Sequence, residues 1–226
     1  IVDEEKVIDG KKLAEGDVLS LYINDEFFEK QKTADDDFLR TDGAIDIIYE
    51  DENIMLLNKK VGLLSHPDDN EYTDTLITRV KRYLYEKGEY NPDEETSFTP
   101  SLVNRIDRNT SGIVIAAKTA AALRILNQKM KDRELHKYYL CVVHGEIEKK
   151  SDTLIGYLIK DEKKNKVTVY TKMREGAKTI KTKYNVLKVR NGLSLVEIEL
   201  LTGRTHQIRA HFASIGQPLL GDGKYG

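Results

Sequence analysis

Five strand patterns follow one another in the second half of the sequence, and they limit the possible folds more than any other feature. They lie at about residues 136–147, 153–159, 167–173, 179–189 and 193–201. Successive strands joined by short connections pair antiparallel. The sequence therefore predicts an α+β fold in which a central mixed, mainly antiparallel sheet is flanked by a few helices.

Helical patterns are few, and each has residues that mark its ends. Three helices are expected, at residues 75–87, 120–131 and 205–216. The side chains of Asp74, Thr119 and Thr205 are suited to cap their first turns. Gly216 can end the third helix, because glycine readily adopts the left-handed conformation found there.

The composition is that of a globular protein that buries a core. Hydrophobic residues make up 39% and charged residues 33% of the 226 residues, which is too polar for a membrane protein. The sequence shows no apolar run long enough to cross a bilayer and no signal peptide. The single cysteine, Cys141, lies in a strand pattern and cannot form an internal disulfide. We therefore expect a cytoplasmic protein with no membrane partner.

Charge is distributed unevenly along the chain. Residues 1–57 contain 17 acids and 6 bases, whereas the remaining residues contain 21 acids and 30 bases. An acidic leader joined to a basic body is compatible with RNA binding by the body. The 10 bases and one acid within residues 163–190 support this interpretation, although solvated lysine faces are also common on sheets.

A polar loop at residues 102–118 leads into an apolar strand and carries one carboxylate between two arginines. Asp107 lies between Arg105 and Arg108, ahead of the apolar run 113–117. Nearby positive charge favours the ionised form of an acid, which suits a nucleophile better than a proton donor. A surface ion pair is the ordinary interpretation of such a loop, so this motif alone does not identify a site.

A second polar cluster lies at residues 201–226 and leads into the third expected helix. Arg204, His206, Arg209 and His211 occur there without an intervening acid. They form a cationic end that can hold an anion, either a phosphate or a carboxylate of the protein. The i, i+5 spacing of the two histidines places them on different helix faces, so we expect no metal site.

Together these segments resemble the RluA-type pseudouridine synthases. NRIDRNTSG and TGRTHQIRAH resemble the two strongest motifs of that family, RELHKYYLCVVHGEI its third, and LLNKKVGLLSHP its opening hairpin. The likeness runs in the same order from about residue 45 onward, so it is far more specific than one short motif. The chain has Asn104 where the family most often has histidine.

The resemblance implies the pseudouridine synthase fold, no cofactor and three catalytic residues. Asp107 would attack the target uridine, at the sugar or at the ring. Tyr139 would stack on the base and take part in proton removal. Arg209 would pair with Asp107 and keep it ionised.

Four further residues are expected to bind the substrate. Arg105 corresponds to the family residue that helps to replace the nucleotide extruded from the RNA. Lys137 belongs to the Lys-x-Tyr pair of the third motif, and Arg204 and His206 belong to the cationic cluster.

The resemblance also divides the chain into three parts. Residues 1–23 resemble the tail of an S4-type RNA-binding module, with a structural strand as the competing interpretation. Residues 24–43 are expected to be an acidic linker. Residues 44–226 would form the catalytic domain, which we expect to be incomplete at its C-terminal end.

Several functions stay open at this point. The first is a monomeric synthase acting on RNA of the large ribosomal subunit (23S), and the second is a synthase acting on transfer RNA. A third is a non-catalytic RNA-binding protein with the same fold. A glycosidase is disfavoured, because such enzymes use two carboxylates and the motifs offer one.

Overall fold

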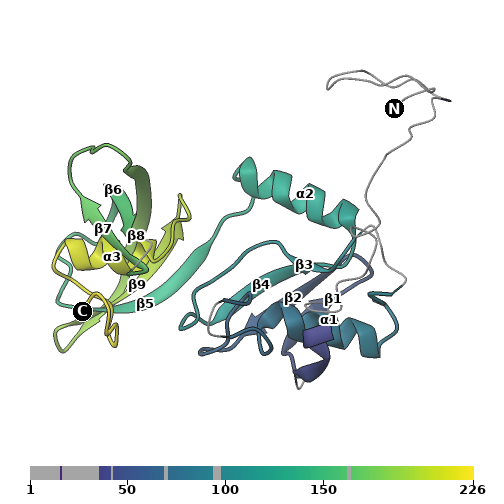
Figure 1. Cartoon of the computed structure of the whole chain (residues 1–226). Helices are drawn as coiled ribbons and strands as arrows, with labels where there is room; N and C mark the ends of the chain where they lie inside the picture. Colours follow the sequence, from purple (N-terminus) through teal and green to yellow (C-terminus); the bar gives the residue numbers. More distant parts are fainter. Residues whose placement is uncertain (1–15, 17–35, 42, 69–70, 94–97, 162–163) are drawn as a thin grey trace.

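The computed structural model describes residues 16, 36–41, 43–68, 71–93, 98–161 and 164–226. Figure 1 shows two lobes, joined by the segment between helix α2 (Ala120–Lys131) and strand β5 (Tyr138–His144). The α+β prediction is confirmed, but the described strands form two antiparallel sheets where one central sheet was expected. No helix in the described ranges is long and apolar enough to cross a membrane. The expected S4-like tail and most of the expected linker lie outside the described residues.

The first lobe is a four-stranded sheet covered by a helix. Its strands are β1 (Ile47–Glu50), β2 (Ile54–Lys59), β3 (Ser101–Leu102) and β4 (Gly112–Ala117), in the spatial order β1-β2-β4-β3. Helix α1 (Leu76–Glu86) buries the apolar stripe of Leu76, Val80 and Leu84 in the core of this lobe. The short 3-10 helix η2 (Asp36–Arg40) adds the buried ring of Phe38 to the same core.

The N-terminal cap of α1 differs from the prediction. Thr75, and not Asp74, is the cap: its hydroxyl accepts from Thr78 N, and Thr78 Oγ1 accepts from Thr75 N in return. Asp74 instead forms a two-bonded ion pair with Arg79, at 2.6 and 2.8 Å. Helix α2 begins behind Thr119, as predicted, because the Thr119 hydroxyl accepts from Ala122 N.

The second lobe is a five-stranded antiparallel sheet with one short helix on it. Its strands are β5, β6 (Ser151–Asp161), β7 (Lys166–Tyr170), β8 (Lys178–Arg190) and β9 (Leu193–Leu200), in the order β5-β9-β8-β6-β7. Helix α3 (Gln207–Ser214) packs the fully buried ring of Phe212 against Tyr184, Val196 and Ile198. This packing fixes α3 on one face of the sheet.

The start of α3 also differs from the prediction. The helix begins at Gln207, and His206 precedes it in a left-handed conformation with φ of 51°, so Thr205 is not the cap. The buried side chain of Gln207 holds this turn. Its Oε1 accepts from Thr202 Oγ1 and Arg204 N, and its Nε2 donates to the backbone of β8. Gly216 lies just beyond the helix with φ of 76°, in the conformation expected of it.

His211 faces the sheet and makes the fold sensitive to acid. Its side chain is 2% exposed and its Nδ1 lies 2.9 Å from Thr182 Oγ1, and burial lowers its pKa to about 4. His211 is protonated with a pKa near 6.5 in the unfolded chain and about 4 in the folded chain. Between these pH values the unfolded chain binds the extra proton, so the free energy of unfolding falls as the pH drops from 6.5 to 4.

We expect His211→Gln to flatten this dependence. His211 accounts for a loss of at most about 3 kcal/mol between pH 7 and pH 4. Urea unfolding at several pH values measures it, with the exposed His144→Gln as the matched control. An unchanged pH slope in His211→Gln would show that His211 does not cause the acid sensitivity.

Candidate active site

The loop that carries Asp107 is held to β4 by an amide side chain. Asn104 Oδ1 accepts from Ile115 N at 2.8 Å, and Asn104 Nδ2 donates to Ile113 O at 3.4 Å. The Asn104 side chain therefore accepts one hydrogen bond from the backbone of β4 and donates another to it. Beyond it the chain turns, with Thr110 N donating to Asp107 O, and leaves the Asp107 side chain 33% exposed.

A second loop, at residues 60–65, braces the Asp107 loop from its other side. Gly62 and Arg108 are joined by two bonds of 2.9 Å, one between backbones and one from Arg108 Nε to Gly62 O. Ser65 Oγ donates to Ile106 O at 3.0 Å and lies 3.3 Å from Ile106 N. The residues on both sides of Asp107 are therefore fixed by the opening hairpin.

Lys59, at the end of β2, joins these two loops from inside the lobe. Its side chain is only 1% exposed, and its ammonium donates to Lys60 O, Leu63 O and Arg108 O at 2.7–3.2 Å. Burial lowers its pKa to about 8, while the negative charge of Asp107 opposes that shift. The ammonium is therefore still protonated at pH 7 and has one N–H for each of the three carbonyls.

The first turn of α3 and the residue before it bring a cationic and a polar group from the second lobe to Asp107. Arg209 Nη1 lies 3.7 Å and His206 Nε2 lies 4.0 Å from Asp107 Oδ2. Burial lowers the pKa of His206, so its imidazole is neutral at pH 7. Two segments about 100 residues apart thus meet across the two lobes.

Arg209 has a closer partner than Asp107. Its Nε and Nη2 donate to the two oxygens of Asp222 at 2.7 and 2.8 Å. These bonds hold the pKa of Asp222 at about 2. Asp222 Oδ1 also accepts from the backbone N–H groups of Lys224 and Tyr225, which closes the GDGKYG turn around the carboxylate. The guanidinium is therefore aimed at Asp107 by a second acid that the sequence analysis missed.

Tyr139 and Tyr138 face opposite sides of β5. Tyr138 is 60% exposed, whereas Tyr139 packs with the core of the second lobe, on the side that α3 covers. Burial, and then the charge of Asp107, raises the pKa of Tyr139. The strand alternation therefore places Tyr139, and not its neighbour, on the side of the sheet that faces the carboxylate.

The other three residues expected to bind the substrate, Lys137, Arg105 and Arg204, form fewer contacts with the residues around Asp107. Lys137 Nζ lies 3.2 Å from the position that a Cβ would occupy on Gly203, in the turn before α3. Arg105 is exposed, and its charge adds to burial in lowering the pKa of His66. Arg204 is also exposed. The structure brings Asp107, Arg209, His206 and Tyr139 together and leaves Arg105 and Arg204 at the surface.

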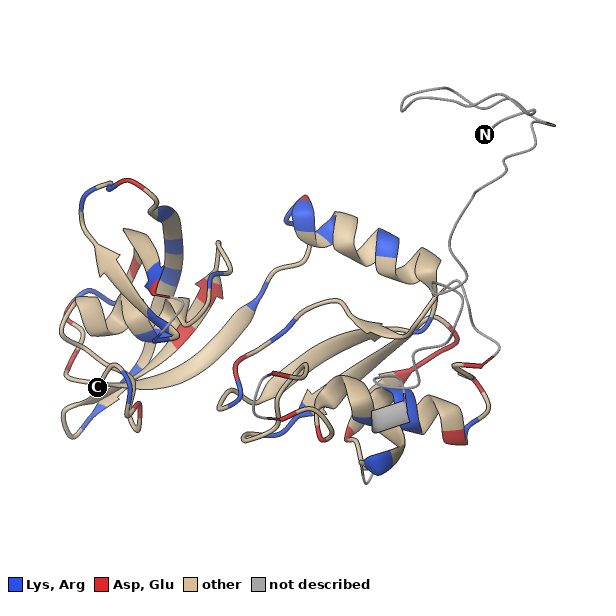
Figure 2. Cartoon of the chain, viewed as in Figure 1, with Lys and Arg blue, Asp and Glu red and all other residues tan. Residues whose placement is uncertain are grey.

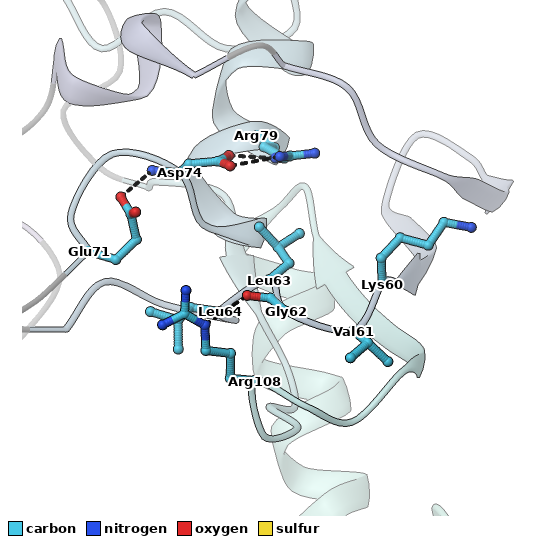
Figure 3. Close-up of a pocket in the computed structure, with 9 residues that line it drawn as sticks. All are labelled: Lys60, Val61, Gly62, Leu63, Leu64, Glu71, Asp74, Arg79 and Arg108. Atoms are coloured by element: carbon cyan, nitrogen blue, oxygen red, sulfur yellow. Dashed lines mark hydrogen bonds and ion pairs between the residues drawn. The ribbon is translucent and has the colours of Figure 1, made fainter.

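A hollow of about 270 Å³ adjoins the same loop on its other side (Figure 3). Figure 3 shows Arg108 bonded to Gly62 and Arg79 bonded to Asp74 along its walls. This hollow is lined by Arg108, by the opening hairpin and by Glu71, Asp74 and Arg79, and not by Asp107.

The chain is similar to known proteins over most of its length. Residues 53–214 match the RNA pseudouridylate synthase family. The chain is 34% identical over 199 residues to ribosomal large subunit pseudouridine synthase D of Borreliella burgdorferi, a match that covers 88% of this chain and 60% of that protein. It is 30% identical over 227 residues to the uncharacterized RNA pseudouridine synthase YhcT of Bacillus subtilis, covering 100% of this chain and 70% of that protein.

Solved structures have the same fold. Human RNA pseudouridylate synthase domain containing 1 superposes with a TM-score of 0.64 at 24% identity, over 81% of this chain and 70% of that chain. Human RNA pseudouridylate synthase domain containing 4 gives 0.65 at 20% identity, over 80% and 69%. The chain has the pseudouridine synthase fold and belongs to the RNA pseudouridylate synthase family.

Proposed function

We propose that this chain is an RNA pseudouridine synthase in which Asp107 is the nucleophile. One observation carries the proposal: a partly exposed carboxylate from one lobe faces the guanidinium of Arg209 at 3.7 Å and the imidazole of His206 at 4.0 Å from the other. The Arg209 cation stabilises the negative charge of the attacking oxygen, and the exposure leaves room for a substrate atom to approach. Residues 44–226 would form the catalytic domain.

The proposed reaction rearranges bonds within the substrate. A carboxylate oxygen of Asp107 bonds to the nucleoside, at the ribose or at the ring, and the bond between C1′ and N1 breaks. The uracil turns, C5 bonds to C1′, and the bond to Asp107 is released. The C5 proton leaves and N1 gains a proton, so atoms and charges balance without a further reactant.

Tyr139 is proposed to stack on the uracil and to take part in removing the C5 proton. Burial raises its pKa, so the phenol is neutral at pH 7 and is a weak base. A neutral phenol can accept the C5 proton only if it gives up its own, so we propose that the hydroxyl proton passes to solvent as the phenol oxygen receives the C5 proton. Arg209, held by Asp222, is proposed to stay beside Asp107 throughout.

The substrate is proposed to be structured RNA, with RNA of the large ribosomal subunit favoured over transfer RNA. The Borreliella burgdorferi relative is named a ribosomal large subunit pseudouridine synthase, which supports this choice. Figure 2 shows basic residues along β8, a surface suited to phosphate groups. Extruding a uridine from a duplex costs a few kcal/mol. Arg105, two residues from Asp107, is proposed to fill the vacated place, and Lys137, Arg204 and His206 are proposed to bind the extruded nucleotide.

Release of tritium tests this function, because forming the C5 bond expels the hydrogen from C5. We expect the purified chain to release tritium from large-subunit RNA transcripts labelled at C5 of uridine. Tritium release from transfer RNA transcripts alone would show that the substrate is transfer RNA and not large-subunit RNA. Binding of RNA without release from either class would contradict an enzyme and favour a non-catalytic RNA-binding protein. Mapping pseudouridine in cells that lack the protein would then identify the modified position.

A further inference from the structure

The hydroxyl of Tyr225 bridges two elements beside the candidate active site. It accepts a hydrogen bond from Val167 N, in β7, at 3.0 Å. It also lies 2.8 Å from His206 Nδ1, in the turn before α3. One phenol oxygen thus ties the edge of the sheet to the imidazole that faces Asp107.

These two contacts favour one position for the proton of the imidazole. The Val167 N–H occupies one lone pair of the phenol oxygen, and His206 Nδ1 is the acceptor placed for the phenol proton. Burial lowers the pKa of His206, so the ring is neutral and carries one N–H. If Nδ1 accepts, the proton is on Nε2, the atom 4.0 Å from Asp107 Oδ2.

The ring of Tyr225 also contacts the second group that faces Asp107. Arg209 Cζ lies 5.1 Å from the ring centroid, and the His206 ring meets Tyr225 edge to face at 5.6 Å. Lys166 Nζ lies 5.6 Å from the same centroid. A cation near an aromatic face is attracted by it. One side chain therefore contacts both groups that meet the carboxylate.

We propose that Tyr225 is a positioning residue, which holds His206 in the tautomer that directs Nε2–H at Asp107 and packs under Arg209. The 4.0 Å separation is longer than a hydrogen bond, and catalytic hydrogen bonds that are long without substrate often tighten when substrate binds. The N–H then stabilises the carboxylate as it forms and releases its bond to the substrate. The effect on turnover rests on the proposed function, whereas the tautomer does not.

Two measurements test this role. Long-range ¹⁵N–¹H NMR spectra distinguish the tautomers of His206, and we expect Nε2–H in the wild type and a mixture in Tyr225→Phe. That substitution keeps the ring under Arg209 and removes only the hydroxyl. We expect kcat for tritium release to fall about 10-fold, with KM for the RNA within about twofold of the wild type.

A matched variant separates positioning from a general loss of packing. Tyr184→Phe removes another largely buried hydroxyl of the same lobe, which donates to Lys149 O at 3.2 Å, and should leave kcat unchanged. In a His206→Ala background, Tyr225→Phe should cost no further activity, because the residue acts through His206.

These measurements distinguish a failure of the positioning role of Tyr225 from a failure of the proposed synthase function. An Nδ1–H tautomer in the wild type would overturn the proposal even if Tyr225→Phe failed to fold. A kcat within twofold of the wild type in Tyr225→Phe would overturn it as well. Absence of tritium release in the wild type would contradict the proposed function and leave the tautomer as the deciding measurement.

Discussion

Asp107→Asn should abolish tritium release, with a loss of at least about 10³-fold in kcat and no loss of folding. Asparagine has nearly the same shape, and the side chain is 33% exposed, so the loop can accept it. The amide oxygen is a far poorer nucleophile than a carboxylate oxygen, which removes the bond-forming step. Stability should change by less than about 1 kcal/mol, because the contacts with Arg209 and His206 are 3.7 and 4.0 Å long and partly solvated.

Asp152→Asn is the matched control for this experiment. Asp152 is a partly exposed aspartate on β6 that pairs with Lys149 at the surface. Its variant should release tritium at the wild-type rate, which would exclude a general effect of removing one acid. Undiminished release from Asp107→Asn would falsify its assignment as the nucleophile.

Local sequence patterns predicted most of the helices and strands and the faces on which their residues lie, whereas the site residues were assigned from the family resemblance. Strand alternation is sufficient to place Tyr139 and Tyr138 on opposite faces, and the sheet has them there. Leu76, Val80 and Leu84 have the helical spacing that puts all three on one face, and this is the buried face of α1. These predictions succeed because side chains repeat every 2 residues along a strand and every 3.6 residues along a helix, whatever the rest of the fold.

The partners of the site residues were not predictable from such patterns. Asp222 and Tyr225 follow α3 in a glycine-rich turn, and no periodicity indicates that they fold back onto Arg209 and His206. An aspartate can pair with an arginine through two bonds, and a tyrosine hydroxyl can bond a histidine. The sequence alone does not show which aspartate or tyrosine lies close enough to do so. The cap of α3 was misplaced for a related reason, because Gln207, and not a cap at Thr205, holds that turn through contacts with β8.

The division of the strands into two sheets was also invisible in the sequence. Each strand pattern specifies a half-buried strand, but it does not specify which neighbour the strand joins. The pairings of β5 with β9 and of β2 with β4 bring together residues that are far apart in the chain. The candidate site depends on this division, since Asp107 belongs to one lobe and Arg209 to the other.

Lys59→Met should destabilise the protein by about 2–4 kcal/mol and lower kcat by at least about 10-fold. Methionine fills nearly the same volume, so the loss comes from the carbonyl oxygens of Lys60 and Leu63, which lose the ammonium donor, and of Arg108, which keeps only its bond from Gly62 N. Each unsatisfied buried carbonyl costs about 1–3 kcal/mol, while removing a buried charge offsets part of that sum. Activity should fall with stability because all three carbonyls lie in the Asp107 loop or in the loop at residues 60–65 that braces it.

Its neighbour provides the control. Lys60 has a side chain that is 68% exposed and forms a surface pair with Asp46, so Lys60→Met should cost less than about 1 kcal/mol and leave kcat within twofold of the wild type. Urea denaturation gives the stabilities, and tritium release gives the rates at a temperature where every variant is folded. Equal stabilities for the two variants would mean that water replaces the Lys59 ammonium at little cost. A stable Lys59→Met variant that had nevertheless lost activity would assign Lys59 an electrostatic effect on Asp107 in place of a structural one.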